Sequence, residues 1–164
     1  MPDFATSGWP FRLYLQEAPG GFPEVPSLMG LHAFWLEKRG DRRLPARADF
    51  PVEELRPWLG HVSLVDVTPA PRRFRWRLVG SGIAEQLGRD ATGRWFDDLY
   101  EGEILDGYVR AYTKAVERRQ PVFHDGDLEF VGKDFQHFKS VHLPLSDDDT
   151  DVNMLMLGLS FDGG

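Results

Sequence analysis

One stretch, residues 61–93, restricts the fold of this chain more than any other part of the sequence. Residues 61–67 and 74–79 have the composition of β-strands, the second with a clear two-residue period, and a proline-rich turn joins them. Short helical turns follow, separated by Gly88 and Gly93, which can end helices in a left-handed conformation. This order favours an antiparallel sheet cupped around a cavity, as in small sensor domains. Since no catalytic motif accompanies it, we expect a module that binds a ligand or a partner.

The remaining elements predict an α+β fold. Ser27 can cap a helix over residues 27–39 that Gly40 ends, and a short helix follows near residues 52–59. A longer amphipathic helix over residues 103–119 should cover the sheet. We therefore expect a five-stranded antiparallel sheet with short helices, one long covering helix and an N-terminal helical extension. The last three strands are predicted at residues 121–130, 135–145 and 152–161.

The predicted elements divide the chain into three segments. The first contains four prolines and lacks a clear period, so we expect order there only where Trp9, Phe11 and Leu13 dock on the body. The segments are a leader at 1–25, the helical extension at 26–59 and a sensor domain at 60–164.

The composition argues against several classes of partner. A net charge of −7 disfavours nucleic acid, because nucleic-acid-binding proteins gather Lys and Arg on one face. The absence of cysteine removes disulfides, thiolate metal ligands and cysteine nucleophiles. The sequence shows no signal peptide and no apolar run approaching the roughly 18 residues that a spanning helix needs. We therefore expect a cytoplasmic protein with neither nucleic acid nor membrane as a partner.

Several short sequence pieces occur in the order and spacing of one known family. They are Trp35, LPARAD at 44–49, LVDV at 64–67, FRWRLVG at 74–80, GRDATG at 88–93 and PLSD at 144–147. Through these pieces the chain, from about residue 28 to residue 162, resembles a family of bacterial stand-alone PAS-like proteins. The resemblance implies a PAS-like fold that senses a small molecule between sheet and helices or joins signalling proteins. Stand-alone members are similar to adaptors of two-component signalling, which implies a signalling protein partner.

The sequence lacks the residues that usually bind cofactors in PAS domains, so no cofactor is assigned. Flavin photochemistry and covalent chromophores in this fold use a cysteine, which the chain lacks. Haem-binding members often use a histidine on the covering helix, and residues 103–119 contain none.

Two groups of histidines could suggest a metal site: His124 with Asp125 and Asp127, or His137 with His142. His137 and His142 are separated by an odd number of residues, so on a regular strand they point to opposite faces. A structural or exposed role is therefore favoured for them, and no metal-binding residue is predicted.

Five residues are candidates for a ligand-binding site in the predicted cavity. Their aromatic side chains suit a flat or apolar ligand, although such residues also fill ordinary cores. Arg77 could recognise an acidic ligand if it points into the cavity. The favoured alternative is that Arg77 points outward and pairs with a carboxylate such as Asp49 or Asp66. The candidates are Trp76, Arg77, Tyr108, Tyr112 and Phe138.

Two other functions compete with a non-enzymatic sensor or adaptor. A small enzyme with a cone-shaped α+β fold would need a converging acid–base pair in its cavity; Asp66 with a histidine, or Asp90 with Thr92, are the candidates, and the sequence does not place either pair together. No catalytic residue is therefore predicted. Cyclic-dinucleotide binding through Arg72 and Arg73 would need a DxSxxG pattern, which is missing.

The last predicted strand is apolar on both faces, whereas an antiparallel strand normally needs only one apolar face. Its second face must meet the N-terminal helix, a second subunit or a signalling partner, and we expect a homodimer or partner surface there. The acidic residues before it, at 147–151, are predicted to form a solvated hairpin tip rather than a metal loop.

Overall fold

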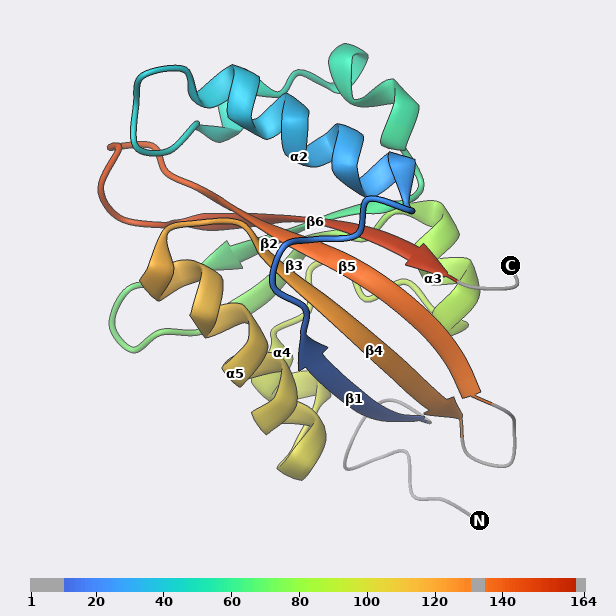
Figure 1. The fold of residues 1–164 in the computed structure, drawn as a ribbon. Helices are drawn as coiled ribbons and strands as arrows, with labels where there is room; N and C mark the ends of the chain where they lie inside the picture. The colour runs from blue at the N-terminus through green and yellow to red at the C-terminus, as the bar shows by residue number, and fades with distance from the viewer. Residues whose placement is uncertain (1–10, 131–134, 162–164) are drawn as a thin grey trace.

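The computed structural model describes residues 11–130 and 135–161. An antiparallel sheet of six strands lies at its centre (Figure 1). The strand order is β1-β4-β5-β6-β2-β3, so that β1 and β3 form the two edges. The strands are β1 (Phe11–Glu17), β2 (Val62–Val67), β3 (Phe74–Leu78), β4 (Val122–Phe130), β5 (Phe135–Leu145) and β6 (Met154–Phe161).

Helices cover both faces of this sheet (Figure 1). Helix α2 (Pro26–Arg39) packs on β5 and β6, and we call the face that it covers the outer face. Helix α5 (Gly102–Arg118) packs on β1, β4, β5 and β6 from the other side, which we call the inner face. No helix within the described ranges combines the length and the apolar character of a membrane span. The shorter helices are η1 (Arg47–Asp49), η2 (Val52–Trp58), α3 (Ser81–Leu87) and α4 (Phe96–Leu99).

The elements predicted from periodicity are confirmed to within a few residues. In β3, Phe74 and Trp76 are buried while Arg77 is exposed, as the two-residue period requires, although Leu78 at the end of the strand is 45% exposed. Helix α3 ends at Gly88, whose φ of 83° lies in the left-handed region. The predicted α+β fold, with an antiparallel sheet between short helices and one long helix, is therefore correct.

The leader contains a strand that the sequence did not predict. β1 pairs with β4 in a regular register that runs from Phe11 opposite Phe130 to Glu17 opposite His124. Leu13 and Leu15 are partly buried against the core, whereas Tyr14 between them is 48% exposed. The prolines of the leader lie outside this strand, so its backbone remains free to pair. The sheet consequently has six strands instead of five, while Trp9 lies outside the described residues.

Helix α2 covers the second apolar face of β6. The outer-face residue Met156 is fully buried, and Leu28 and Leu31 of α2 lie above its neighbour Gly158. A Cβ built on Gly158 would stand only 2.7 Å from Leu31 Cδ2, so glycine allows the close approach of helix and sheet. The N-terminal helix therefore occupies this face, which no longer supports the predicted homodimer or partner surface there.

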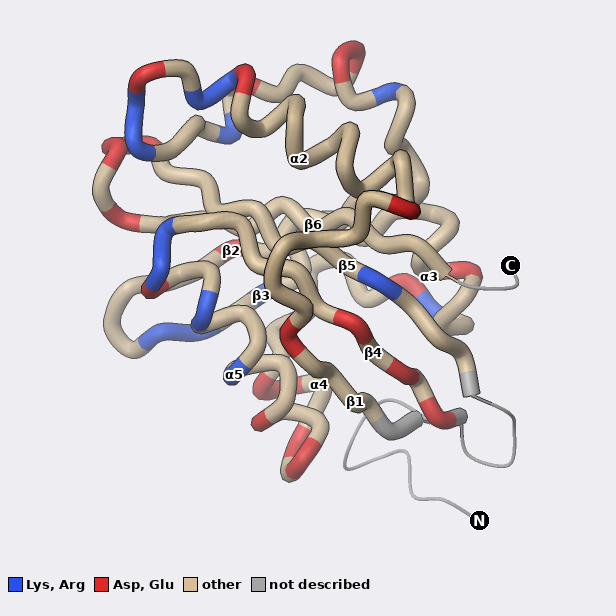
Figure 2. Tube along the Cα trace, viewed as in Figure 1, with Lys and Arg blue, Asp and Glu red and all other residues tan. Residues whose placement is uncertain are grey.

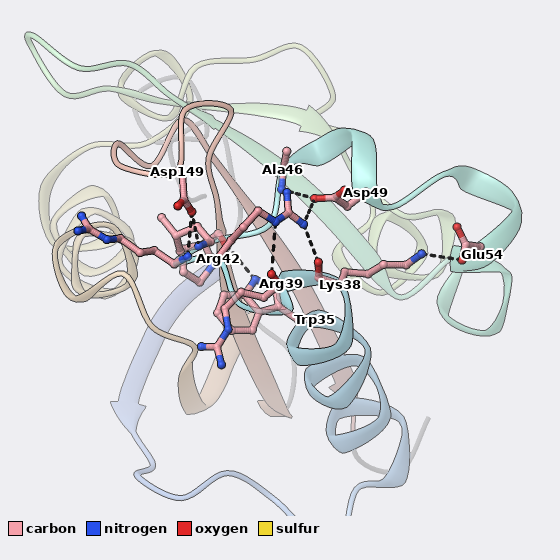
Figure 3. Close-up of polar contacts among 11 residues, drawn as sticks. Trp35, Lys38, Arg39, Arg42, Ala46, Asp49, Glu54 and Asp149 are labelled. Carbon is pink, nitrogen blue, oxygen red and sulfur yellow. Dashed lines mark hydrogen bonds and ion pairs between the residues drawn. The ribbon is translucent and has the colours of Figure 1, made fainter.

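Hydrogen bonds connect α2 and the loop that follows it to the β5–β6 hairpin (Figure 3). The Trp35 indole donates to the Pro144 carbonyl at 2.9 Å. Asp149 accepts from the backbone N–H groups of Arg43 and Leu44, both at 2.9 Å. The predicted hairpin tip is thus not only solvated, since Asp149 binds the segment that follows α2.

Candidate ligand-binding site

A small cavity lies between the inner face of the sheet and helices α3 and α5, with a volume of about 30 Å³. Of the five candidate residues, Trp76, Tyr108, Tyr112 and Phe138 line it, and each is 5% exposed. Arg77 lies on the opposite side of β3 and is exposed. Adjacent side chains of a regular strand point to opposite faces, so Trp76 inside the cavity places Arg77 outside it.

The aromatic wall of the cavity is a packed cluster around Trp76. Its ring centroid lies 4.6 Å from that of Phe96 and 6.2 Å from that of Tyr108, which meets it edge to face. The Trp76 indole donates a hydrogen bond to the Tyr100 hydroxyl at 3.2 Å. Burial raises the pKa of Tyr100 to about 12 and that of Tyr108 well above its usual value. This wall is therefore uncharged at neutral pH.

Phe138 reaches the cavity because its neighbour on β4 is glycine. A Cβ on Gly126 would stand 2.5 Å from Phe138 Cζ, and 2.8 Å from the Tyr14 carbonyl oxygen on the other side. The ring of Phe138 therefore lies over the backbone of β4, where no other residue type would leave room for it.

A polar patch interrupts the otherwise apolar lining. Ser63 of β2 and Ser140 and His142 of β5 line the cavity and are at most 2% exposed. His142 Nε2 lies 3.1 Å from Ser140 Oγ, but Ser63 Oγ and His142 Nδ1 have no hydrogen-bond partner among the described residues. Buried polar atoms without a partner cost free energy, so both atoms favour a polar group inside the cavity.

His142 stacks on a second buried histidine, which sequence reasoning did not pair with it. The rings of His124 and His142 lie 4.6 Å apart at 20°, and neither nitrogen of His124 has a hydrogen-bond partner in the described part of the chain. The β4–β5 register, with His124 opposite Ser140, brings the rings together. His137, paired with His142 in the sequence analysis, is exposed and contacts Asp127 instead. The stack could have been predicted from the sequence only by aligning the two strands that became β4 and β5 in their correct register.

Both stacked imidazoles are neutral at physiological pH. Burial, with a smaller contribution from Lys114, lowers the pKa of His124 to about 4, although Glu17 acts in the opposite direction. Burial also lowers the pKa of His142 well below its ordinary value, with further contributions from His124 and Lys114. The cavity therefore contains hydrogen-bonding groups but no charge that could balance an ion inside it.

The carboxylates considered for catalysis or for Arg77 have local partners. Asp66 accepts from Arg75 at 2.7 Å, and Asp49 accepts from Arg42 at 2.8 Å. Neither is paired with Arg77. Asp90 accepts from the backbone N–H and the hydroxyl of Thr92, which is a turn-capping geometry.

The arginines considered for cyclic-dinucleotide binding also have acidic neighbours. Arg72 lies 3.3 Å from Glu117, and Arg73 forms two hydrogen bonds with Asp97. Arg73 also lies over the Trp95 ring, 4.1 Å from its centroid.

The arrangement of a sheet, short helices and one long helix around a cavity agrees with a comparison with known families. The family model of the PAS domain matches residues 24–160. No curated protein and no solved structure matches the chain. Because the family model extends from α2 to β6 and thus includes the cavity lining apart from β1 and Phe161, the resemblance seen in the sequence is confirmed, and the chain belongs to the PAS domain family.

Proposed function

We propose that this chain is a non-enzymatic sensor or adaptor of bacterial signal transduction that binds part of a small molecule in the cavity beneath α5. The observation that carries this proposal is the pair of unpartnered buried atoms, Ser63 Oγ and His142 Nδ1, in an otherwise apolar cavity. A ligand with hydrogen-bonding groups can supply partners for these atoms while its remaining surface contacts the aromatic wall.

The chemistry of the lining restricts what can enter. The neutral imidazole and the neutral phenols offer no counter-charge, so the buried part of the ligand is uncharged and mainly apolar. The volume of about 30 Å³ corresponds to roughly two water molecules. The cavity as it stands therefore suits only a short chain, and a ring or a longer chain requires movement of the wall.

The competing hypothesis, an acid–base enzyme, receives less support from the cavity. The described residues that line it include Ser63, Ser140 and His142 but no Asp or Glu. General acid–base catalysis between two carboxylates, or between a carboxylate and His142, thus has no lining residue to act as its acidic member. PAS domains are in general non-enzymatic signalling domains, which agrees with our proposal.

The adaptor part of the proposal concerns a signalling protein partner. PAS domains commonly bind partners. The solvent-facing side of α5 offers an exposed apolar residue, Val109, directly after the cavity residue Tyr108. A ligand that shifts Tyr108 would thereby alter the surface beside it. A homodimer and a two-component partner stay predictions, as does a cytoplasmic location.

Native mass spectrometry of the freshly purified chain tests the sensor proposal, with butanol to hexanol added as probes if the chain is bare. We expect a bound small molecule or saturable alcohol binding, weakened several-fold by Ser63→Ala because one hydrogen bond is lost. Ser160→Ala is the matched control, since Ser160 lies on β6 but does not line the cavity. A bare chain that binds no probe, or equal effects of both substitutions, would overturn the proposal.

A further inference from the structure

A polar groove lies beside the cavity, between the edge strand β1 and α5. It has a volume of about 410 Å³, and its lining includes Leu13, Leu15, Arg110, Lys114 and His124. Leu13 and Leu15 also line the cavity, so these two side chains form a wall between both spaces.

His124 is the buried polar residue of this groove. Its side chain lines the groove although the residue is only 1% exposed, and both of its ring nitrogens lack a partner among the described residues. Its ring stacks on His142, which lines the cavity. The histidine pair therefore connects the polar groove with the polar patch of the cavity.

The end of the groove next to His124 has an excess of positive charge. Glu17, directly opposite His124 in the sheet, is the carboxylate that contacts both Lys114, at 3.8 Å, and Arg118. Two cations thus share one anion. The acidic groove residues Glu103 and Asp106 lie nearer the N-terminal end of α5, about 12 Å or more along the helix from Lys114 (Figure 2).

We propose that the ligand of this domain is a short-chain hydroxycarboxylate, with its carboxylate in the groove beside Lys114 and His124 and with its chain and hydroxyl group in the cavity that Ser63 and His142 line. This inference rests on the proposed function and names its ligand class. The local excess of one positive charge matches a monoanion, and the imidazole N–H of His124 supplies a hydrogen bond to it. The limited cavity volume restricts the chain to a few carbon atoms.

The chain can reach both spaces if the wall between them moves. Leu13 and Leu15 belong to an edge strand, which is hydrogen-bonded to the sheet only through β4. Both side chains are partly buried rather than locked in the core. The proposed binding mode therefore requires these two leucines to rotate, because they are the side chains that line both spaces and lie between them.

Calorimetric titration of the full chain with matched probes tests the inference, using 4-hydroxybutanoate, 5-hydroxypentanoate and 6-hydroxyhexanoate against the diols butane-1,4-diol, pentane-1,5-diol and hexane-1,6-diol as the uncharged alcohols. We expect each carboxylate to bind at least about tenfold more tightly than its alcohol. Lys114→Met keeps the apolar stem but removes the charge, and should abolish this preference, while Lys114→Arg should retain it. Arg77→Met is the control for a general loss of positive charge, because Arg77 lies outside cavity and groove, and should change nothing.

The possible results separate the two proposals. If alcohols and carboxylates bind equally well, or if Lys114→Met leaves the preference intact, the carboxylate inference is overturned while the sensor proposal stands. If neither class of probe binds and the purified chain is bare, the sensor proposal fails and this inference fails with it.

Discussion

At the residue scale, Gly126 shows how one missing side chain shapes the cavity. A Cβ at this position would meet Phe138 Cζ at 2.5 Å and the Tyr14 carbonyl oxygen at 2.8 Å. The ring could turn away, but the backbone of β1 could not move without straining its pairing with β4. We predict that Gly126→Ala lowers the free energy of unfolding by about 1–3 kcal/mol in urea titrations. Gly107→Ala on α5 meets no atom within 4 Å and should instead raise it, by up to about 1 kcal/mol.

The buried histidines give the molecule a specific response to acid. Because burial depresses the pKa of His124 to about 4 in the folded state, the unfolded chain binds more protons between that value and the ordinary pKa near 6.5. Stability should therefore fall as the pH drops through this window and should be insensitive to His124 above it. We predict that His124→Leu reduces the slope of unfolding free energy against pH between 6.5 and 4. An unchanged slope in this variant would contradict the assignment of the acid response to His124.

The residues of the candidate site show which of its features the sequence could predict and which it could not. The inward-facing positions of Trp76, Tyr108 and Tyr112 could be predicted, because each residue follows a helix or strand period within one element. Arg77 was proposed for the same cavity although it follows Trp76 directly, and strand alternation makes that combination impossible without a bulge. The stack of His124 on His142 depends on the register between two strands, which a period within either strand does not determine.

At the scale of elements, the loop after α2 is fixed by one carboxylate from the β5–β6 hairpin. Asp149 accepts from the N–H groups of Arg43 and Leu44, and Leu44 is 1% exposed, so water cannot readily replace the carboxylate. We predict that Asp149→Ala lowers the unfolding free energy by about 1–3 kcal/mol. Asp149→Asn keeps an acceptor oxygen and tolerates the positive φ of 64°, and should cost less. Equal losses in both variants would show that the hydrogen bonds are unimportant.

Most elements could be predicted because they combine a clear period with a terminating residue, as α3 does with Gly88. β1 was missed although Phe11, Leu13 and Leu15 alternate with more polar residues, because the prolines on both sides of it suggest irregular structure. Its position at the edge of the sheet depends on pairing with β4, which the local pattern does not determine. The missed strand is also the one that contributes the wall between cavity and groove.

At the scale of the whole molecule, the question is whether the helical extension and the sheet unfold together. The sequence divides them at residues 59 and 60, yet Leu31 and Trp35 of α2 are fully buried. Trp35 is hydrogen-bonded to β5, and α2 fills the face of β6 that would otherwise be exposed. Removing α2 would therefore expose the apolar outer face, so the contacts favour one cooperative unit.

Native-state hydrogen exchange measures this directly. We predict that the amides of Trp35 in α2 and of Val65 in β2 open with the same free energy, equal to that of global unfolding in urea. Leu31→Ala should lower both by the same amount, about 2–5 kcal/mol, because it leaves a cavity between helix and sheet. Leu36→Ala is the matched control on the same helix, where the side chain is 40% exposed and little should change. If Trp35 exchanged with a much lower free energy than Val65, the extension would be a separate unit docked on an independently stable sheet.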